Sequence, residues 1–209
     1  MFEKIKKYGF KKAVLLSLSV IGDMLGIHVM KMHYLRLNTD IDIVKKQLSG
    51  FDLEVRELNY DDFYKGDHNV FNGIKMDLYK DRILDDGYYC YGIFENDKLI
   101  YSTWFSVNKL GLPVTKKKYQ LQPNEGLLED SYCFPAARGR GFHSKMNFFR
   151  IKKLYELGKN RVIVILLDGN EPAMKVQVKS GFEELGVFYV GSFWGWKFCT
   201  LSKDKFDKM

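Results

Sequence analysis

The stretch LLEDSYCFPAARGRGFHSKM, residues 127 to 146, restricts the fold of this chain more than any other. It begins as an apolar strand, passes through one proline and reaches an Arg-Gly-Arg-Gly turn before residues with helical spacing. The free N–H groups in the first turn of a helix, together with the positive end of the helix dipole, bind anions such as phosphate. Glycine lets that backbone approach an anion closely. The stretch therefore predicts a phosphate-binding turn between a strand and a helix.

The elements around this turn predict an α+β domain. Alternating apolar and charged residues predict a strand at 51 to 58, and two β-type runs around residues 95 to 97 predict a hairpin. A helix to about residue 157, the apolar strand RVIVILL (161 to 167), a helix capped at Asn170 and aromatic strands follow the turn. This order predicts a mixed, mostly antiparallel central sheet flanked by helices.

The first 50 residues have a different character. A lysine-rich head precedes an apolar run from residue 13 to residue 30, which an acidic residue and a histidine interrupt. Neither a membrane-spanning helix nor a secretory signal is therefore predicted. The apolar spacing predicts an amphipathic helix packed on the domain or on a partner chain; peripheral membrane contact by residues 1 to 30 is the less favoured alternative. We expect an accessory segment at 1 to 50 and the main domain at 51 to 209.

Cysteine, histidine and charge usage narrow the class of protein. The three cysteines have no C-x-x-C spacing, so the chain predicts neither a disulfide framework nor a zinc site and suits the cytoplasm. The four histidines form no H-E-x-x-H motif, and we expect no metal. The net charge is +7, and its basic excess in the C-terminal half lies with the glycine-rich turn. This distribution favours a small bound polyanion over a nucleic acid.

Two motifs resemble those of the GNAT N-acetyltransferase superfamily. Arg138, Gly141 and position 143 resemble the motif R/Q-x-x-G-x-G/A, and NEPAMKVQVKSGF (170 to 182) resembles the helix N-x-x-A-x-x-x-Y-x-x-x-G-F. The LED at 128 to 130 is similar to the diamine acetyltransferase branch. The resemblance covers about residues 51 to 200. It implies a GNAT fold that transfers an acetyl group from acetyl-CoA directly to a primary amine of a small acceptor, either a polyamine-like amine or an amino sugar.

The resemblance also implies which residues bind acetyl-CoA. Backbone groups near the end of the strand would pair with the pantetheine arm, amides of the turn would hold the pyrophosphate, and an asparagine would contact the CoA arm. These residues are Cys133, Phe134, Arg138, Gly139, Arg140, Gly141, Phe142, His143, Ser144 and Asn170. For Cys133 we prefer a buried strand residue to a nucleophile, because the superfamily transfers the acetyl group directly.

Glu129 is the base that the resemblance implies. A primary amine with a pKa near ~10 is protonated at neutral pH and must lose a proton before it attacks. In a regular strand Asp130 would point to the opposite face from Glu129. Gln177 stands where the family has its acid tyrosine. Tyr132 and Tyr189 are fallback proton donors, but for each we prefer a packed strand aromatic. The alternative to a catalytic role for Glu129 and Asp130 is that both are acids on a solvated strand face.

Departures from the family pattern motivate two alternative functions. His143 replaces a glycine or alanine, so its side chain must turn away from the phosphates or contact them. Together with Gln177 it motivates a non-catalytic CoA-binding module. The N-terminal segment motivates a membrane-surface acyltransferase that uses longer acyl chains. The acidic segment at 61 to 86 either attracts a cationic acceptor or is an exposed helix face. The oligomeric state stays open, with a homodimer as one alternative.

Overall fold

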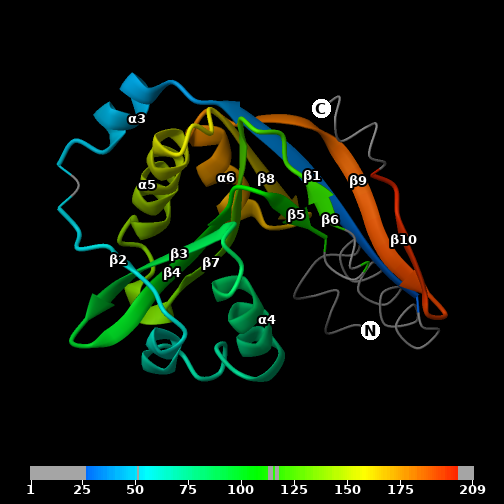
Figure 1. Ribbon diagram of the computed structural model, residues 1–209, viewed down its shortest axis with the longest axis horizontal. Coiled ribbons are helices and arrows are strands. Elements are labelled where there is room, and N and C mark those ends of the chain that lie inside the picture. Colours follow the sequence, from blue (N-terminus) through cyan, green and yellow to red (C-terminus); the bar gives the residue numbers. More distant parts are fainter. Residues whose placement is uncertain (1–26, 51, 113–114, 116–117, 202–209) are drawn as a thin grey trace, which may run out of the picture.

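The computed structural model describes residues 27–50, 52–112, 115 and 118–201. In this part of the chain an eight-stranded sheet has the order β10-β9-β1-β8-β7-β4-β3-β2, and β5 and β6 form a separate hairpin (Figure 1). The strands are β1 (Ile27–Asn38), β2 (Arg56–Glu57), β3 (Tyr88–Glu95), β4 (Lys98–Ser106), β5 (Lys109–Gly111), β6 (Lys118–Gln120), β7 (Glu125–Cys133), β8 (Arg161–Leu167), β9 (Glu183–Phe193) and β10 (Trp196–Cys199). The helices are α3 (Ile41–Gln47), α4 (Gly73–Ile83), α5 (Phe142–Glu156) and α6 (Glu171–Lys179), with 3-10 helices η1 (Asp61–Lys65) and η2 (Pro135–Ala137).

Strand β1 comes from the segment that the sequence placed outside the main domain. It pairs with β8 on one side and with β9 on the other, so it is an interior strand of the sheet. Tyr34 and Leu35 are both fully buried, in clusters on opposite faces. Residues 27 to 50 therefore contribute a central strand and α3 to the domain. The amphipathic helix predicted before residue 27 lies outside the described residues.

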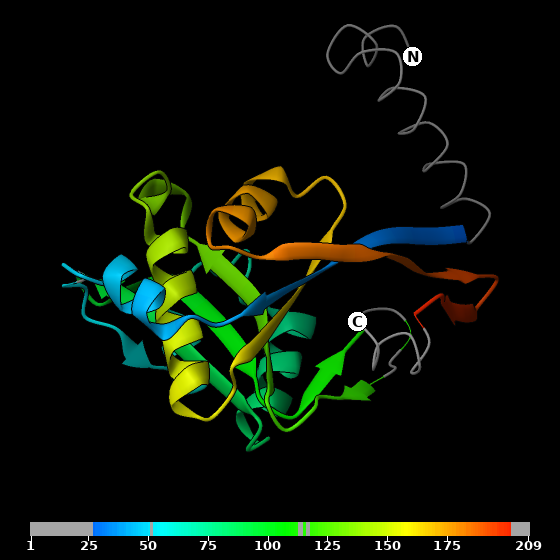
Figure 2. The ribbon, with the colours of Figure 1, turned by 90° about the horizontal axis from the view of Figure 1, so that it is seen from above.

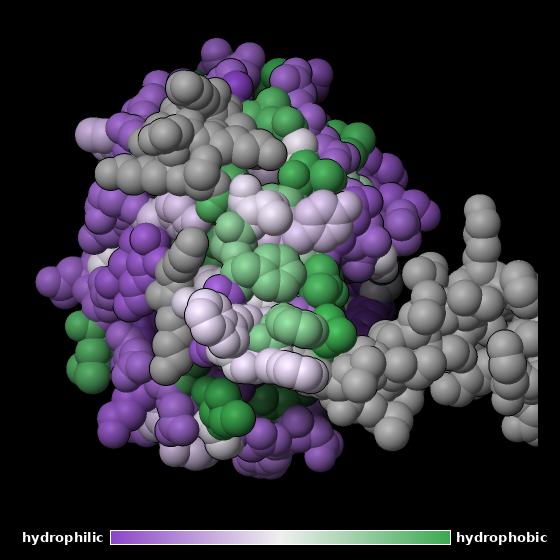
Figure 3. Space-filling model, turned by 90° about the vertical axis from the view of Figure 1, so that its right-hand side faces the viewer, coloured by the Kyte–Doolittle hydropathy of each residue, from purple (hydrophilic) through white to green (hydrophobic). Residues whose placement is uncertain are grey.

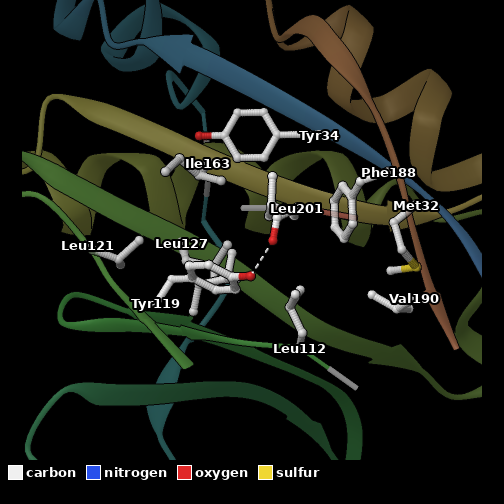
Figure 4. Packing of buried hydrophobic residues seen from close by; sticks show 11 residues of the cluster. Met32, Tyr34, Leu112, Tyr119, Leu121, Leu127, Ile163, Phe188, Val190 and Leu201 are labelled. Atoms are coloured by element: carbon white, nitrogen blue, oxygen red, sulfur yellow. Dashed lines mark hydrogen bonds between the residues drawn. The ribbon is translucent and has the colours of Figure 1, made fainter. Parts of the chain in front are cut away.

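Helices cover both faces of the sheet. Helices α5 and α6 lie on one face and α4 lies on the other (Figures 1 and 2). Alternate strand residues point to opposite faces, so Leu128 packs beneath α5 while Leu127 joins the cluster shown in Figure 4. The β5–β6 hairpin closes the cluster shown in Figure 4, to which it contributes Leu110 and Tyr119. Its Tyr119 is buried, and the phenol donates to the Leu201 carbonyl at 2.6 Å.

The parallel pair of the sheet separates partway along its length. Strands β7 and β8 pair from Glu125 to Leu128, opposite Arg161 to Val164. Beyond that point, among the described residues, β7 pairs with β4 alone and β8 with β1 alone. A bulge at Asp130, whose φ is +30°, interrupts the β4–β7 register there, and such bulges bend a strand. The two strands therefore diverge.

Candidate active site

A cavity of about 370 Å³ lies where β7 and β8 diverge, and we call it the splay cavity. Its walls come from residues 127 to 131 of β7, residues 164 to 167 of β8, and side chains of α5 and α6. Each of the two diverging segments has one edge without a strand partner. An extended molecule that carries amide groups can pair with such a strand edge.

The glycine-rich turn leads from the end of β7 into α5. Gly139 and Gly141 have φ values of +80° and +79°, a region that side-chain-bearing residues rarely adopt. A Cβ added at either position would meet no atom within 4 Å, so the backbone of the turn is open. Gly141 is the N-cap of α5 and has no side chain to satisfy the first-turn N–H groups. These features fit a bound phosphate.

The two arginines of the turn have partners within the chain. Arg138 donates from Nε to the Cys133 carbonyl at 3.2 Å. Arg140 forms a two-armed ion pair with Glu95 and lies over the Phe142 ring at 4.6 Å. This pairing lowers the pKa of the Glu95 carboxyl. The backbone of the turn, rather than these side chains, therefore offers the open anion site.

Cys133 is the last residue of β7, and Phe134 follows it beside this turn. Burial raises the pKa of the Cys133 thiol, which disfavours the nucleophilic thiolate. The Phe134 N–H already donates to the Ile100 carbonyl at 2.8 Å. The Phe134 carbonyl accepts from the Ala137 N–H at 2.8 Å, so both backbone groups of Phe134 already have partners within the chain.

His143 turns its side chain away from the open side of the turn and into the protein. Its Nδ1 lies 2.8 Å from the Tyr101 hydroxyl, and Tyr101 is fully buried on β4. Burial, with a smaller contribution from the Arg150 charge, lowers the pKa of His143 to about 4. The imidazole is therefore neutral at physiological pH, and it lines the splay cavity.

Glu129 and Asp130 both bind Arg82 of α4. Arg82 forms an ion pair with Glu129 and approaches Asp130 Oδ2 with Nη1 at 3.4 Å. Asp130 also accepts from the Tyr79 hydroxyl at 2.9 Å and from Lys75 at 3.3 Å. The expectation that the two acids face opposite ways is wrong, because the bulge at Asp130 breaks the alternation of side chains.

Glu129 lies between two cavities. It lines the splay cavity and also a larger cavity of about 1090 Å³ beside α4, which we call the α4 cavity. Burial raises the pKa of Glu129 to about 6, against the opposing effect of Arg82. Its Oε1 is buried without a hydrogen-bond partner among the described residues. Glu129 is thus ionised at neutral pH and accepts a proton more readily than an ordinary glutamate.

The α4 cavity is lined by acids, cations and apolar side chains. Three aspartates lie at its wall, and one of them, Asp85, forms an ion pair with Lys109. Most of the residues at its wall are exposed or only partly buried, and the cavity is open to solvent. Its lining includes Leu78, Asp81, Arg82, Leu84, Asp85, Asp86, Tyr88, Lys109, Leu112 and Glu129.

Gln177 occupies the position of the family's tyrosine and lines the splay cavity. It is buried and forms a double amide pair with Asn147: Asn147 donates at 3.1 Å, and Gln177 donates in return at 3.3 Å. Arg150 donates from Nη2 to the same Asn147 Oδ1 at 3.1 Å. The Arg150 guanidinium therefore polarises the amide pair of Asn147 and Gln177.

Arg150 is a functional candidate that the sequence interpretation missed. It is fully buried, and no described carboxylate forms an ion pair with it. Its Nη1 donates at 3.1 Å to the carbonyls of both Trp104 and Glu129, at the bulge. Burial lowers the pKa of the guanidinium. The available signal was its position on the apolar stripe of α5, four residues before Leu154 and four after Met146.

The remaining candidates are dispersed. Asn170 caps α6 by accepting from the Ala173 N–H at 3.3 Å, and it lines the splay cavity. Ser144 is exposed in the first turn of α5. Tyr132 donates to Asp67, whereas Tyr189 is exposed on β9 and lines neither cavity. Within the described residues no cluster of histidine, cysteine and acidic side chains is arranged to hold a metal ion.

Comparisons with known proteins bear on the fold. No family model matches the sequence, and no curated protein matches it. A solved structure assigned to the GNAT acetyltransferase family, from Novosphingobium aromaticivorans, has a TM-score of 0.53 and 11% identity over 78% of this chain and 64% of that one. A protein of unknown function from Staphylococcus epidermidis has a TM-score of 0.56 and 12% identity over 83% of this chain and 65% of that one. The chain thus spans less than two thirds of either neighbour.

The likeness covers most of this chain. The mixed, mostly antiparallel sheet predicted from the sequence is confirmed, while the more specific similarity to diamine acetyltransferases stays a prediction. The chain therefore has the fold of the GNAT N-acetyltransferases.

Proposed function

We propose that this chain transfers an acetyl group from acetyl-CoA to a primary amine of a small acceptor. The placement of Glu129 carries the proposal, because a buried carboxylate with a pKa of about 6 stands between the splay cavity and the α4 cavity. A base at a junction of two cavities can take a proton from a molecule in one cavity while that molecule attacks a group held in the other.

The chain offers acetyl-CoA two kinds of backbone partner. The open turn at Gly139 and Gly141, with the free N–H groups that begin α5, suits the pyrophosphate. The unpaired edges of β7 and β8 suit the amides of the pantetheine arm. Asn170 lines the same cavity. No metal is needed for this binding, because backbone N–H groups and the positive end of the α5 dipole supply the attraction.

The proposed reaction releases two protons from the amine nitrogen. Glu129 takes the first from the ammonium, and the neutral amine nitrogen bonds to the thioester carbonyl carbon. The carbon–sulfur bond then breaks to release a thiolate, and the nitrogen loses its second proton to this thiolate or to water, which leaves a neutral amide. A thiol has a pKa near ~8.5, so its thiolate leaves without obligatory protonation. Gln177 cannot give up a proton, but its amide N–H is a hydrogen-bond donor at this cavity. The missing tyrosine therefore slows the reaction without preventing it.

The acceptor class follows from the lining of the α4 cavity. Asp81 and Asp86 add negative charge beside Glu129, while Leu84 and Leu112 add apolar surface. Negative charge attracts a cationic amine, and apolar surface packs against its carbon skeleton. A polyamine-like amine or an amino sugar fits this description.

The first test is calorimetric titration of the full chain with acetyl-CoA, followed by thiol release against a panel of amines and amino sugars. We expect binding at micromolar levels and release with at least one acceptor. Glu129→Gln should lower kcat/KM by about 10²- to 10⁴-fold, whereas Glu156→Gln, at the exposed end of α5, should not. Binding without release on any acceptor would favour a CoA-binding module instead, and absence of binding would overturn the proposal.

The pH profile gives an independent check on Glu129. Its base form is deprotonated, so kcat/KM should rise with pH through about 6 and then level off, unless the amine's own ionisation extends the rise. His143 is neutral throughout this range and should add no step, because its pKa is about 4. If kcat/KM instead rose around the ordinary pKa of a glutamate, burial would not be raising the pKa of the catalytic base.

A further inference from the structure

The paired ends of β1, β9 and β10 carry aromatic side chains on a projection, which we call the aromatic arm (residues 27–31 and 189–199). It extends away from the helices and beyond the rest of the sheet (Figures 1 and 2). Trp194 and Trp196 are 73% and 82% exposed, and Phe193 is 48% exposed. Apolar side chains of this size rarely gather on a monomer surface without a binding partner.

The tip of the arm is strained as well as exposed. Trp194 has a φ of +46° in the two-residue turn that it forms with Gly195, a conformation that favours asparagine or glycine over a bulky side chain. The Phe193 and Trp194 rings stack with centroids 5.3 Å apart. The stacked pair therefore lies at the turn of the β9–β10 hairpin, where both rings are exposed and core packing does not require them.

The arm itself carries cations and no acidic residue. Residues 27–31 and 189–199 include Lys31 and Lys197 but no aspartate or glutamate. Lys31 forms an ion pair with Asp168 at 3.2 Å, so Lys197 is the lysine of the arm beside the exposed rings. In Figure 3, which views the molecule from the arm's side, residues of intermediate and hydrophobic character gather at the centre of this face. The sequence that precedes Ile27, the partner of Phe193, holds five lysines in its first 12 residues.

We propose that the aromatic arm docks on an anionic lipid bilayer surface. Tryptophan and phenylalanine favour the boundary between headgroups and acyl chains, and nearby lysines are attracted to anionic headgroups. A second copy of the arm fits less well, because it would bring the same cations against one another. Docking would need no spanning segment: none of the helices in the described ranges is long and apolar enough to cross a membrane.

Tryptophan fluorescence of the full chain tests the proposal directly. Trp104 is fully buried and gives a constant signal, so changes report on Trp194 and Trp196. With vesicles of phosphatidylcholine containing about 30% phosphatidylserine, we expect a blue shift and quenching by brominated acyl chains. Vesicles of phosphatidylcholine alone should bind at least about tenfold more weakly. No shift and no cosedimentation with the anionic vesicles would overturn the proposal.

Two variants separate the arm from other surfaces. Trp194→Asn combined with Trp196→Thr removes both rings but suits the turn and the strand, and should weaken vesicle binding about tenfold or more. Ile43→Ala, which trims a side chain 55% exposed on α3, is the matched control and should bind as the wild type does. Equal binding of the double variant would place the contact elsewhere and refute the proposal.

Two other occupants of the arm predict different results. If residues 1–26 covered the rings, emission without vesicles would be blue-shifted and would move to the red on their deletion. If a second copy covered them, the blue shift would depend on protein concentration. Either result without lipid-dependent quenching would overturn membrane docking. None of these readouts depends on acetyl transfer.

Discussion

The two halves of the β7–β8 pair put the same two strands to different uses. In the paired half, Leu127 and Leu128 fill the clusters on the two faces of the sheet. In the splayed half, Glu129 and Asp130 carry charge, and the strand edges lose their partners. The bulge at Asp130 separates the halves. Stability and chemistry are therefore assigned to adjacent residues of one strand, and substitutions on either side of the bulge should have different consequences.

Clustered charge marks the splayed half. Glu129 and Arg82 form an ion pair close to Arg150, whose guanidinium holds two carbonyls at the bulge. Ion pairs removed from water contribute little net stability and often cost some. In the paired half a single buried carboxylate, Glu125, pairs with Arg161 where the two strands begin. The splayed half instead gathers two carboxylates and two guanidinium groups around the bulge, which indicates that these charges are kept for the site.

The largest expected contrast comes from truncating one leucine in each half. Leu128→Ala removes a buried side chain and should lower the free energy of unfolding by about 2–5 kcal/mol. Leu167→Ala, in the splayed half of β8, trims a side chain that is 47% exposed and should change it by less than about 1 kcal/mol. Urea denaturation measures both. Equal losses would show that the splayed half is part of the core.

The second contrast concerns the support of the bulge. Arg150→Lys keeps a positive charge but cannot reach both carbonyls and Asn147 together, so the free energy of unfolding should fall by about 2–3 kcal/mol. Lys152→Ala, which breaks a surface ion pair with Glu156 on the same helix, should cost less than about 1 kcal/mol. Arg150→Lys with wild-type stability would show that the clamp is dispensable.

The third contrast compares two glutamates of β7 and works through pH. The folded state raises the pKa of Glu129 from 4.5 to about 6, so it binds more protons than the unfolded state between these values and loses stability as the pH rises. Glu129→Gln should therefore raise the free energy of unfolding at pH 7 by up to about 2 kcal/mol, and by almost nothing below pH ~4.

The matched variant for this contrast is Glu125→Gln in the paired half. It breaks the ion pair with Arg161 and weakens acceptance of the Gln122 N–H, so it should lower stability at pH 7. Denaturation curves at several pH values show whether each variant raises or lowers the free energy of unfolding. If both variants destabilise at pH 7, burial does not govern the Glu129 carboxyl.

The fold was predictable wherever a local pattern decided the structure. The β3–β4 hairpin formed without glycine because Asn96 and Asp97 both tolerate positive φ, with values of 50° and 59°. The location of β1 in the sheet was not predictable, because strand order depends on long-range pairing that a strand pattern does not specify. In the predicted strand 51 to 58, the described residues 52–58 form only the two-residue strand β2, since alternation indicates a strand without supplying a full-length partner.

The site was predictable only in part. Motif spacing identified Glu129, the turn and Gln177, and the structure brings Glu129 and Gln177 to one cavity. The shared orientation of Glu129 and Asp130 was missed because a bulge leaves no mark in the alternation of residue types. Arg82 and Asn147 were missed because their roles depend on partners far away in the sequence. Tyr189 was chosen for its chemistry, and β9 places it outside both cavities.

The smallest effect tests the phosphate-binding turn at the start of α5. Gly139→Ala puts a side chain on a backbone with a φ of +80°, which should cost about 1 kcal/mol of stability. Gly158→Ala, at the other end of α5, has a φ of +76° and equally open surroundings, so it should cost about the same.

Calorimetry with acetyl-CoA then separates the two glycines. Gly139→Ala should weaken binding about tenfold by holding the phosphate away from the backbone, because close approach is what glycine provides there. Gly158→Ala should leave the affinity unchanged. Equal affinities in the two variants would mean that the anion is held elsewhere, and the open turn would then be a feature of chain geometry alone.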